Sequence, residues 1–365
     1  MTDPHHPGRA VGRAGRPSQR TVAGVLAVPL LVVLWGAAVL LPVPFVTYAP
    51  GLTLDVLGAE DGRELVQVNG ERTYRDGGEL RMTTVFVSQP GADVNLFEAM
   101  KAWLSDEEAV IPYDAVYDED ETAEDADRES SVAMVSSQDA ATAVALRELG
   151  YEVDPVVEVL AVDEGRPADG RLEVRDQVLA VDGAPIETSE DVGEAVRAAG
   201  AGSPVEFRVR RDGEERTVSV TPEEVDGRPL VGVQVGPGYE FPVDVRVEVP
   251  QEIGGPSAGL IFSLAIYDTL TEGSLTGGAV VAGTGTVDER GNVGPIGGIQ
   301  QKIVGARDAG AELFLVPPDN CDDALDAPGG GIELVRADTM HDARLALEAY
   351  AEDPDADLPR CTEEG

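Results

Sequence analysis

The segment "IGGPSAGLIFSLAIYDTL", Ile253–Leu270, places a serine between a glycine-rich turn and an apolar run. Proline favours the first helical position, and the apolar spacing that follows predicts a helix beginning at about Pro256. Ser257 then lies in the first turn, where free N–H groups and the helix dipole stabilise an alkoxide or an oxyanion. Plain helix capping explains the same residues, so this segment alone leaves the role of Ser257 open.

A second segment, "GNVGPIGGIQQKIVGARDAGAELFLVPPDN", Gly291–Asn320, predicts a helix with one apolar face that ends near Gly310, followed by a strand. Lys302 lies on the buried edge of this helix. Desolvation lowers the pKa of an unpaired lysine from about 10.4 towards neutrality, and a neutral amine is a competent general base. A lysine whose stem lies along the apolar surface and whose charged end reaches water is the alternative.

Lysine and histidine are both scarce in this chain. The only lysines are Lys101 and Lys302, and neither follows the glycines of a phosphate-binding loop, so an ATPase motor of that type is excluded. A Ser-His-Asp triad would have to use His341, because His5 and His6 precede the first apolar segment.

The composition also restricts the partners. With 27 basic and 68 acidic residues, a formal charge of -41, the folded part repels nucleic acid. Cys321 and Cys361 are too few for a zinc site or a disulfide framework, so no metal or cofactor is expected. Whether the two cysteines form a single bond in an oxidising compartment stays open at this point.

The N-terminal region predicts a membrane anchor. Residues 1–20 form a cytoplasmic tail with four arginines, and residues 21–41 are a charge-free run long enough to span a hydrocarbon core of about 30 Å. The flanking arginines place the remainder of the chain outside the cytoplasm. A cleaved signal peptide is the alternative, although Pro50 follows the best cleavage site and should hinder it.

Residues 48–150 form the N-terminal part of the expected protease region, and its first half is predicted to form strands. The acidic segment 105–131 is expected to be a solvated loop, and a helix is predicted over Ser137–Leu149. Residues 351–365 are expected to form an acidic C-terminal tail.

Residues 151–225 follow the order strand, turn, "PADGRLEVRDQVLAVDG", a helix at about 189–199, and a hairpin turning at Asp212–Gly213. This order resembles a PDZ domain of the kind attached to bacterial proteases. The resemblance implies that an extended peptide is captured by strand addition beside that helix. Three residues around the expected groove strand are the candidates for peptide binding: Tyr151, Val153 and Val156.

The combination of "GGPSAG" with "GPIGGIQQKIVGARDAG" and "PPDN", within residues 235–350, resembles the proteolytic domain of Lon peptidases. The resemblance implies that Ser257 is the nucleophile and Lys302 the base of a Ser-Lys dyad, and that Thr284 orients the lysine. Gly254 and Gly255 are further candidates for shaping the site or its oxyanion donors. The family's usual residues before Gly-Pro-Ser and after Thr-Gly are replaced here by Ile253–Gly254 and Thr286.

Together these features predict an α+β protein: a single transmembrane helix and a Lon-type proteolytic domain into which a PDZ-like domain is inserted. The implied function is an ATP-independent, membrane-anchored serine endopeptidase that cuts unfolded or terminal segments of extracytoplasmic proteins and uses no nucleotide. A homo-oligomer is expected by resemblance, although no spacing in the sequence indicates one. The rival hypothesis is an inactive PDZ adaptor. A dinucleotide enzyme is excluded, because Asp288 replaces the third glycine of the phosphate-binding motif.

Overall fold

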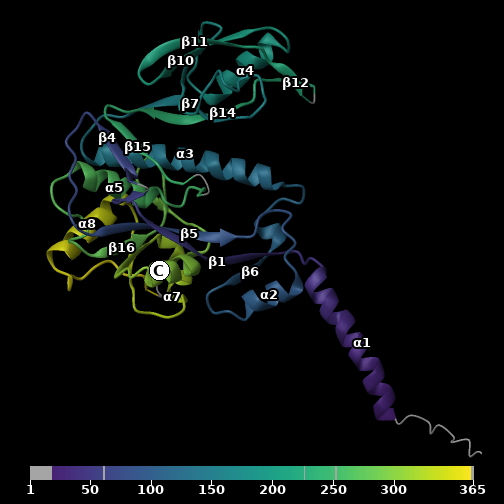
Figure 1. The fold of residues 1–365 in the computed structure, drawn as a ribbon. Helices are drawn as coiled ribbons and strands as arrows, with labels where there is room; N and C mark the ends of the chain where they lie inside the picture. The colour runs from purple at the N-terminus through teal and green to yellow at the C-terminus, as the bar shows by residue number, and fades with distance from the viewer. Residues whose placement is uncertain (1–18, 61, 226, 251–252, 363–365) are drawn as a thin grey trace, which may run out of the picture.

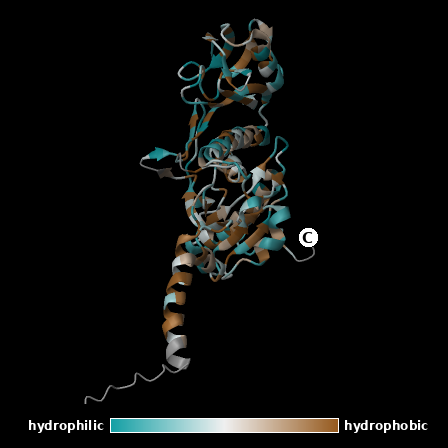
Figure 2. Cartoon of the chain, turned by 90° about the vertical axis from the view of Figure 1, so that its right-hand side faces the viewer, coloured by the Kyte–Doolittle hydropathy of each residue, from teal (hydrophilic) through white to brown (hydrophobic). Residues whose placement is uncertain are grey.

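The computed structural model describes residues 19–60, 62–225, 227–250 and 253–362. Nearly all of the predicted cytoplasmic tail, residues 1–20, lies outside these ranges. Helix α1 projects from one end of the molecule, a mixed sheet with its helices forms the central body, and a second sheet lies at the opposite end (Figures 1 and 2).

Helix α1 (Gln19–Leu40) is mostly apolar after its first residues (Figure 2). Its 18-residue stretch Ala23–Leu40 has no buried residue and is long and apolar enough to cross a membrane. At 1.5 Å per residue this stretch is about 27 Å long, close to the thickness of a hydrocarbon core. Length and composition fit a membrane span or a signal sequence equally.

The central sheet is assembled from both halves of the chain. Its strand order is β20-β19-β16-β5-β1-β6. Three strands precede the second sheet in sequence, β1 (Phe45–Asp55), β5 (Glu79–Val87) and β6 (Ala109–Pro112), and three follow it, β16 (Val280–Gly283), β19 (Leu313–Val316) and β20 (Glu333–Arg336). The predicted insertion of one domain into the other is therefore confirmed.

Helices cover both faces of this sheet. Leu313 and Leu315 pack into a core with α3 (Ala123–Glu148), α5 (Gly259–Leu270) and α8 (Met340–Glu352). Phe314 and Val316 point to the opposite side, into a core with α6 (Ile299–Asp308) and α7 (Cys321–Leu325). Alternate residues of a strand thus supply two cores.

The acidic segment 105–131 is not the solvated loop that its composition predicts. It contains β6, the short 3-10 helix η1 (Tyr113–Ala115) and the first turns of α3. A reciprocal capping box between Thr122 and Asp125 starts α3 at Ala123. The negative charges of Glu124 and Asp125 also lie at the positive end of the helix dipole, so here the carboxylates stabilise a helix.

The second sheet has the strand order β11-β10-β8-β7-β14, with β9 paired to β8. The strands are β7 (Asp154–Val162), β8 (Gln177–Val181), β9 (Ala184–Pro185), β10 (Val205–Arg211), β11 (Glu214–Val220) and β14 (Val233–Glu240). Helix α4 spans Ser189–Ala199 and the β10–β11 hairpin turns at Asp212–Gly213, both as predicted. A core that includes Val159, Phe207 and Val209 fills this domain.

Short strands complete the fold. β12 (Glu223–Val225) pairs with β13 (Arg228–Leu230), β2 (Ala59–Glu60) with β3 (Arg63–Glu64), and β17 (Thr286–Val287) with β18 (Val293–Gly294). The pair of β4 (Val66–Asn69) with β15 (Asp244–Val247) joins the chain before the insertion to the chain after it. Helix α2 (Leu96–Trp103) packs on β1 and β6.

The two domains meet at α3, which contacts β7 and β14. Arg175 donates to Gln138 Oε1 at 2.9 Å and pairs with Asp139 at 3.2 Å. Glu158 and Asp139 are both only 3% exposed, and burial together with the neighbouring Asp139 raises the pKa of Glu158 to about 9. Glu158 therefore carries a proton near neutral pH, and this proton lets it donate to Asp139.

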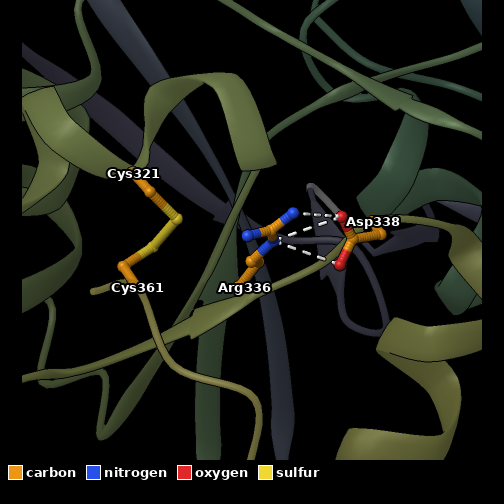
Figure 3. Close-up of a disulfide and its surroundings, with 4 residues drawn as sticks. All are labelled: Cys321, Arg336, Asp338 and Cys361. Atoms are coloured by element: carbon orange, nitrogen blue, oxygen red, sulfur yellow. Dashed lines mark hydrogen bonds and ion pairs between the residues drawn. A yellow bond between two sulfur atoms is a disulfide. The ribbon is translucent and has the colours of Figure 1, made fainter. Parts of the chain in front are cut away.

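The C-terminal segment is anchored to the central body. Cys321 and Cys361 form a disulfide across 40 residues, drawn in Figure 3 beside the ion pair of Arg336 with Asp338. Leu358 is buried, and the Arg336 N–H donates to the Pro359 carbonyl at 2.9 Å. Of the predicted acidic tail, residues 351–352 end α8, and Pro359 and Arg360 lie against β20.

Candidate active site

Ser257 lies in a turn that two glycines shape. Gly255 has φ +85°, a conformation that favours glycine, and its N–H donates to the Ser130 carbonyl at 2.9 Å. A Cβ on Gly254 would lie 2.1 Å from Ser130 Oγ. Helix α3, which carries Ser130, thus holds the turn from one side.

The helix after this turn begins at Gly259, three residues later than the sequence predicts. The Ser257 carbonyl accepts from the Gly285 N–H at 2.8 Å and from Thr284 Oγ1 at 2.9 Å, so it is not available to begin a helical ladder. The Pro256 carbonyl accepts from Ser137 Oγ at 2.9 Å. As a result the half-buried Ser257 stands outside the helix instead of in its first turn.

Lys302 reaches Ser257 from α6, which packs on β1, β5 and β16. Its side chain is 2% exposed, and its Nζ lies 2.7 Å from Ser257 Oγ. Burial lowers the pKa of Lys302 to about 7. The alternative of a lysine whose charged end reaches water is wrong, because Nζ is enclosed with the two hydroxyl groups.

Thr284 lies directly after β16 and is fully buried. Its hydroxyl donates to the Ser257 carbonyl, so its oxygen serves as an acceptor for Lys302 Nζ, at 3.0 Å. One N–H of a neutral lysine is thereby directed at Thr284. The lone pair of Nζ can then face the hydroxyl of Ser257.

A cleft of about 580 Å³ opens in front of Ser257 and Lys302. One wall is residues 83–87 of β5, and α3 supplies Asp127, Ser130 and Met134. β16 pairs with β5 only as far as Met82, and within the described ranges no strand pairs with that side of residues 83–87. The cleft therefore has an unpaired strand edge beside the serine.

The three residues suggested as shaping the site or donating to an oxyanion have different surroundings. Thr284 is committed to the Ser257 carbonyl and Lys302, and the Gly255 N–H is committed to Ser130. Gly254 lies beside Ser130 at the rim of the cleft. In the described part of the chain, the N–H groups of Ser257 and Ala258 have no acceptor.

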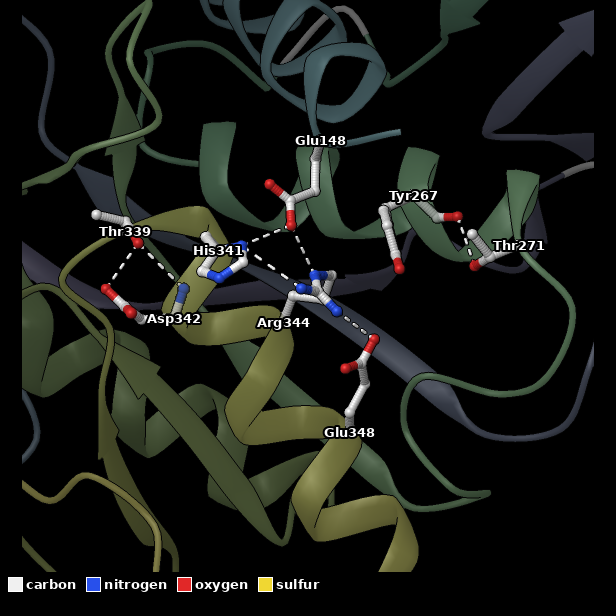
Figure 4. Close-up of polar contacts among 8 residues, drawn as sticks. All are labelled: Glu148, Tyr267, Thr271, Thr339, His341, Asp342, Arg344 and Glu348. Atoms are coloured by element: carbon white, nitrogen blue, oxygen red, sulfur yellow. Dashed lines mark hydrogen bonds and ion pairs between the residues drawn. The ribbon is translucent and has the colours of Figure 1, made fainter. Parts of the chain in front are cut away.

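His341 belongs to a different cluster, shown in Figure 4. Its Nδ1 lies 2.7 Å from Glu148 Oε1, and Arg344 links Glu148 with Glu348. Ser137 of α3 marks the position of Ser257 along this helix, because it donates to the carbonyl of the preceding Pro256. Glu148, which holds His341, is the last residue of α3, eleven residues or about 16 Å farther along the helix. A triad of Ser257 with His341 is therefore excluded by position.

The predicted peptide-binding residues do not line a groove. Val153 is buried in the core of the central body and Tyr151 packs against it. Val156 lies on β7, where it pairs with Gly238 of β14, so the β14 side of this strand is not free for a peptide. The sheet ends instead at β14, which α4 contacts and which pairs with no strand but β7 among the described residues.

Three features of these sites were not predicted from the sequence: Ser130 and Ser137 on α3, the free edge of β5, and the free edge of β14. None of them has a local signal, because each arises when segments distant in sequence pack together. Within the described ranges, no group of three or more His, Cys, Asp or Glu residues could hold a metal ion.

Comparisons with known proteins identify both domains. Residues 240–343, which contain Ser257, Thr284 and Lys302, match the Lon protease (S16) C-terminal proteolytic domain. Residues 114–221 match a PDZ domain. The chain therefore contains a Lon-type proteolytic domain and a PDZ domain, as the sequence predicted, and the former indicates a serine peptidase.

Two relatives agree with the assignment of the proteolytic domain. Lon protease 1 of Bacillus subtilis is 36% identical over 97 residues, which cover 26% of this chain and 12% of the relative. Lon protease of Rhizobium meliloti is 31% identical over 167 residues, or 44% of this chain and 20% of the relative. The chain thus spans a fifth or less of these curated relatives. The PDZ domain of an SdrC-like protein from Listeria innocua is 23% identical over 22% of this chain and 92% of that chain, with a TM-score of 0.21.

Proposed function

We propose that this protein is a membrane-anchored serine endopeptidase that works without ATP through a dyad of Ser257 and Lys302. The observation that carries the proposal is the 2.7 Å separation of Lys302 Nζ from Ser257 Oγ, with the lysine buried and its pKa lowered to about 7. A base of that pKa is half neutral at physiological pH, and only the neutral amine can take the serine proton.

The reaction proceeds in two halves. Neutral Lys302 takes the hydroxyl proton as Ser257 Oγ attacks the peptide carbonyl carbon, and the resulting ammonium then gives this proton to the departing amine nitrogen. The acyl-enzyme that remains is attacked by water, whose proton again passes to Lys302. The ester bond to Ser257 Oγ then breaks, and Lys302 returns a proton to this oxygen, so the enzyme is restored. Thr284 holds Nζ in position throughout both halves.

The substrate lies extended along the free edge of β5. Residues 83–87 offer backbone groups for strand addition, and an extended peptide there passes Ser257. The free N–H groups of Ser257 and Ala258 are the candidate donors to the developing oxyanion. Such a site requires an unfolded segment, because a folded substrate has no free strand to pair.

The PDZ domain recruits polypeptides at β14. The groove lies between this edge strand and α4, and it accepts a peptide along residues 233–236, because Pro237 has no N–H to continue a ladder. This proposal replaces the expected groove around Val156. The domain is distant from α1 in both overall views (Figures 1 and 2), so recruitment occurs away from the membrane.

Helix α1 is the anchor, with the N-terminus in the cytoplasm and the catalytic domain outside the cytoplasm. The four arginines before residue 21 support this orientation, and the Cys321–Cys361 disulfide suits an oxidising compartment. The absence of a lysine in a phosphate-binding loop supports activity without a nucleotide.

The test uses the whole chain in detergent or nanodiscs, incubated with casein as an unfolded substrate and without ATP. The parent should release peptides detectable by mass spectrometry, whereas Ser257→Ala should release none. Ser203→Ala, in an exposed loop of the PDZ domain, is the matched control and should behave as the parent. Absence of cleavage by the parent, even with added peptide ligands of the PDZ groove, would favour the inactive adaptor instead.

A further inference from the structure

Helix α2 carries its large apolar residues on the outside. The two residues that it buries against the body are alanines, Ala99 and Ala102. Its exposed apolar residues, with the one that follows the helix, are Leu96, Phe97, Met100, Trp103 and Leu104. A helix of a globular domain normally shows the opposite arrangement.

These five residues form one stripe, which we call the α2 stripe. Their spacing of i, i+1, i+4, i+7 and i+8 confines them to about 120° of the helix circumference. Trp103 is 76% exposed and Leu104 is 72% exposed, more than Leu26 or Val28 in α1. A contiguous patch of this kind marks an interaction surface.

The α2 stripe lies next to the end of the apolar helix α1. Pro42 and Asn95 form a backbone bridge, and the Val43 N–H donates to the Val94 carbonyl at 2.8 Å. Asn95 is the N-cap of α2, and α1 and α2 contact each other. Figure 1 shows α2 beside the end of α1 that enters the body. The start of α2 is therefore fixed within a few residues of the point where α1 ends.

We infer that α2 lies in the headgroup region of the bilayer that α1 spans, with the α2 stripe inserted among the lipids. This inference rests on the proposed anchor. Short amphipathic helices bury their apolar side at the boundary between headgroups and acyl chains, and tryptophan favours this depth. The occupant is lipid and not a second copy of the chain, because the stripe continues directly from the end of the membrane span.

The contact is apolar and not electrostatic. The chain has a formal charge of -41, and Glu98, Asp106 and Glu107 lie exposed in and after α2. Such a surface is repelled by anionic lipid, so zwitterionic phosphatidylcholine is the favoured lipid. High salt should leave the contact intact, because no ion pair holds it.

A second membrane contact would restrict rotation of the body about α1. Tyr48 lines the catalytic cleft and lies eight residues after Leu40, so it is at most about 28 Å from the end of α1 along an extended chain. The cleft thus stays near the bilayer, while the PDZ domain lies at the opposite end of the molecule from α1 (Figure 1). This arrangement favours substrates whose cleavage site lies close to the membrane.

Two tryptophans make the inference measurable, because Trp35 lies in α1 and Trp103 in α2 and there is no other in the chain. The full chain with Trp35→Phe, one copy per phosphatidylcholine nanodisc, reports on Trp103 alone. We expect a lipid with a quencher near the headgroup to reduce Trp103 emission by about twofold or more, and a quencher deep in the acyl chain to act more weakly. Trp103→Phe, which reports on Trp35, is the matched measurement for the span.

The outcomes separate this inference from the proposed function. Quenching of Trp35 without quenching of Trp103 overturns the position of α2 and leaves the anchor intact. Absence of quenching at both residues overturns the anchor as well. Shielding of Trp103 only in discs that hold several copies would assign the α2 stripe to contacts between chains and would also overturn the inference. Casein cleavage by the same preparations reports on the dyad independently.

Discussion

Lys302 and Glu158 are both buried and ionisable, and burial favours the neutral form of each, yet only Lys302 lies in the candidate active site. Lys302 is 2% exposed and Glu158 is 3% exposed, and burial is the largest cause of the pKa shift in each. Lys302 faces two hydroxyl groups at the inner wall of a cleft. Glu158 faces Asp139 and Arg175 where the two domains meet.

The difference shows that the groups around a residue with a shifted pKa decide whether that residue can take part in catalysis. A neutral amine presents a lone pair, and here the nearest proton is on a serine that opens onto an unpaired strand edge. A neutral carboxyl presents a proton, and here a second carboxylate accepts it inside an interface. We therefore expect one group to control catalysis and the other to control the stability of the joint between the domains.

The largest expected effect contrasts these two groups directly. Lys302→Met should lower kcat/KM for peptide cleavage by about 10³-fold, because it removes the general base. Glu158→Gln should change kcat/KM by less than about threefold, because its carboxyl has no part in proton transfer at the dyad. The comparison uses steady-state rates on one peptide substrate at pH 8. Lys101→Met, at the exposed second lysine, controls for loss of a positive charge. Equal losses of kcat/KM in Lys302→Met and Glu158→Gln would contradict the distinction between the two groups.

A smaller effect is expected at Thr284, which positions Lys302. Thr284→Val removes the acceptor of the Nζ proton and should lower kcat/KM by about 10-fold to 100-fold. Loss of this acceptor disfavours the charged lysine, so the midpoint of the pH–rate profile should also move below about 7. Thr284→Ser should restore both the rate and the midpoint. A rate loss with an unmoved midpoint would indicate a merely structural role.

The smallest effect concerns stability. The pKa of Glu158 is raised from 4.5 to about 9 on folding, so the folded state binds more protons and stability from this group falls as pH rises between these values. The pKa of Lys302 is lowered from 10.5 to about 7, so its effect has the opposite sign from pH 7 to 10.5. Glu158→Gln should therefore gain stability relative to the parent as pH rises from about 5 to about 9.

Urea unfolding of the full chain at several pH values, followed by circular dichroism, measures this difference. The exposed Glu152→Gln variant should show no such trend and is the matched control. Lys302→Met should lose its advantage over the parent as pH rises above 7. Parallel curves for the parent and Glu158→Gln would mean that Glu158 is already charged in the folded protein.

The sequence identified the two domains because their motifs are local. Gly-Pro-Ser before an apolar run and a lysine on the buried side of a second helix are visible without a structure, as are α4 and the turn at Asp212–Gly213. The helical start at Gly259 was not predictable. It depends on the carbonyl of Ser257 accepting from Gly285 and Thr284, which are distant in sequence.

The peptide groove was misplaced for a related reason. By resemblance to PDZ domains, the sequence suggests that the groove strand is the one around Val156, directly after "LGYEVDP", Leu149–Pro155. β14, which follows the β10–β11 and β12–β13 hairpins, returns to cover that edge. Strand order depends on such pairings and not on order along the chain. The helical start of α3 was hidden for another reason, because carboxylates dominate its composition while Thr122 and Asp125 cap it.

The central claim is that neutral Lys302 is the base for Ser257, and the pH dependence of kcat/KM tests it most directly. Between pH 5.5 and 9 the parent should gain about tenfold per pH unit at low pH and reach a plateau above a midpoint near 7. Lys302→Arg should show no such rise, because guanidinium keeps its proton throughout this range. A flat profile for the parent, or the same profile in Lys302→Arg, would contradict the account.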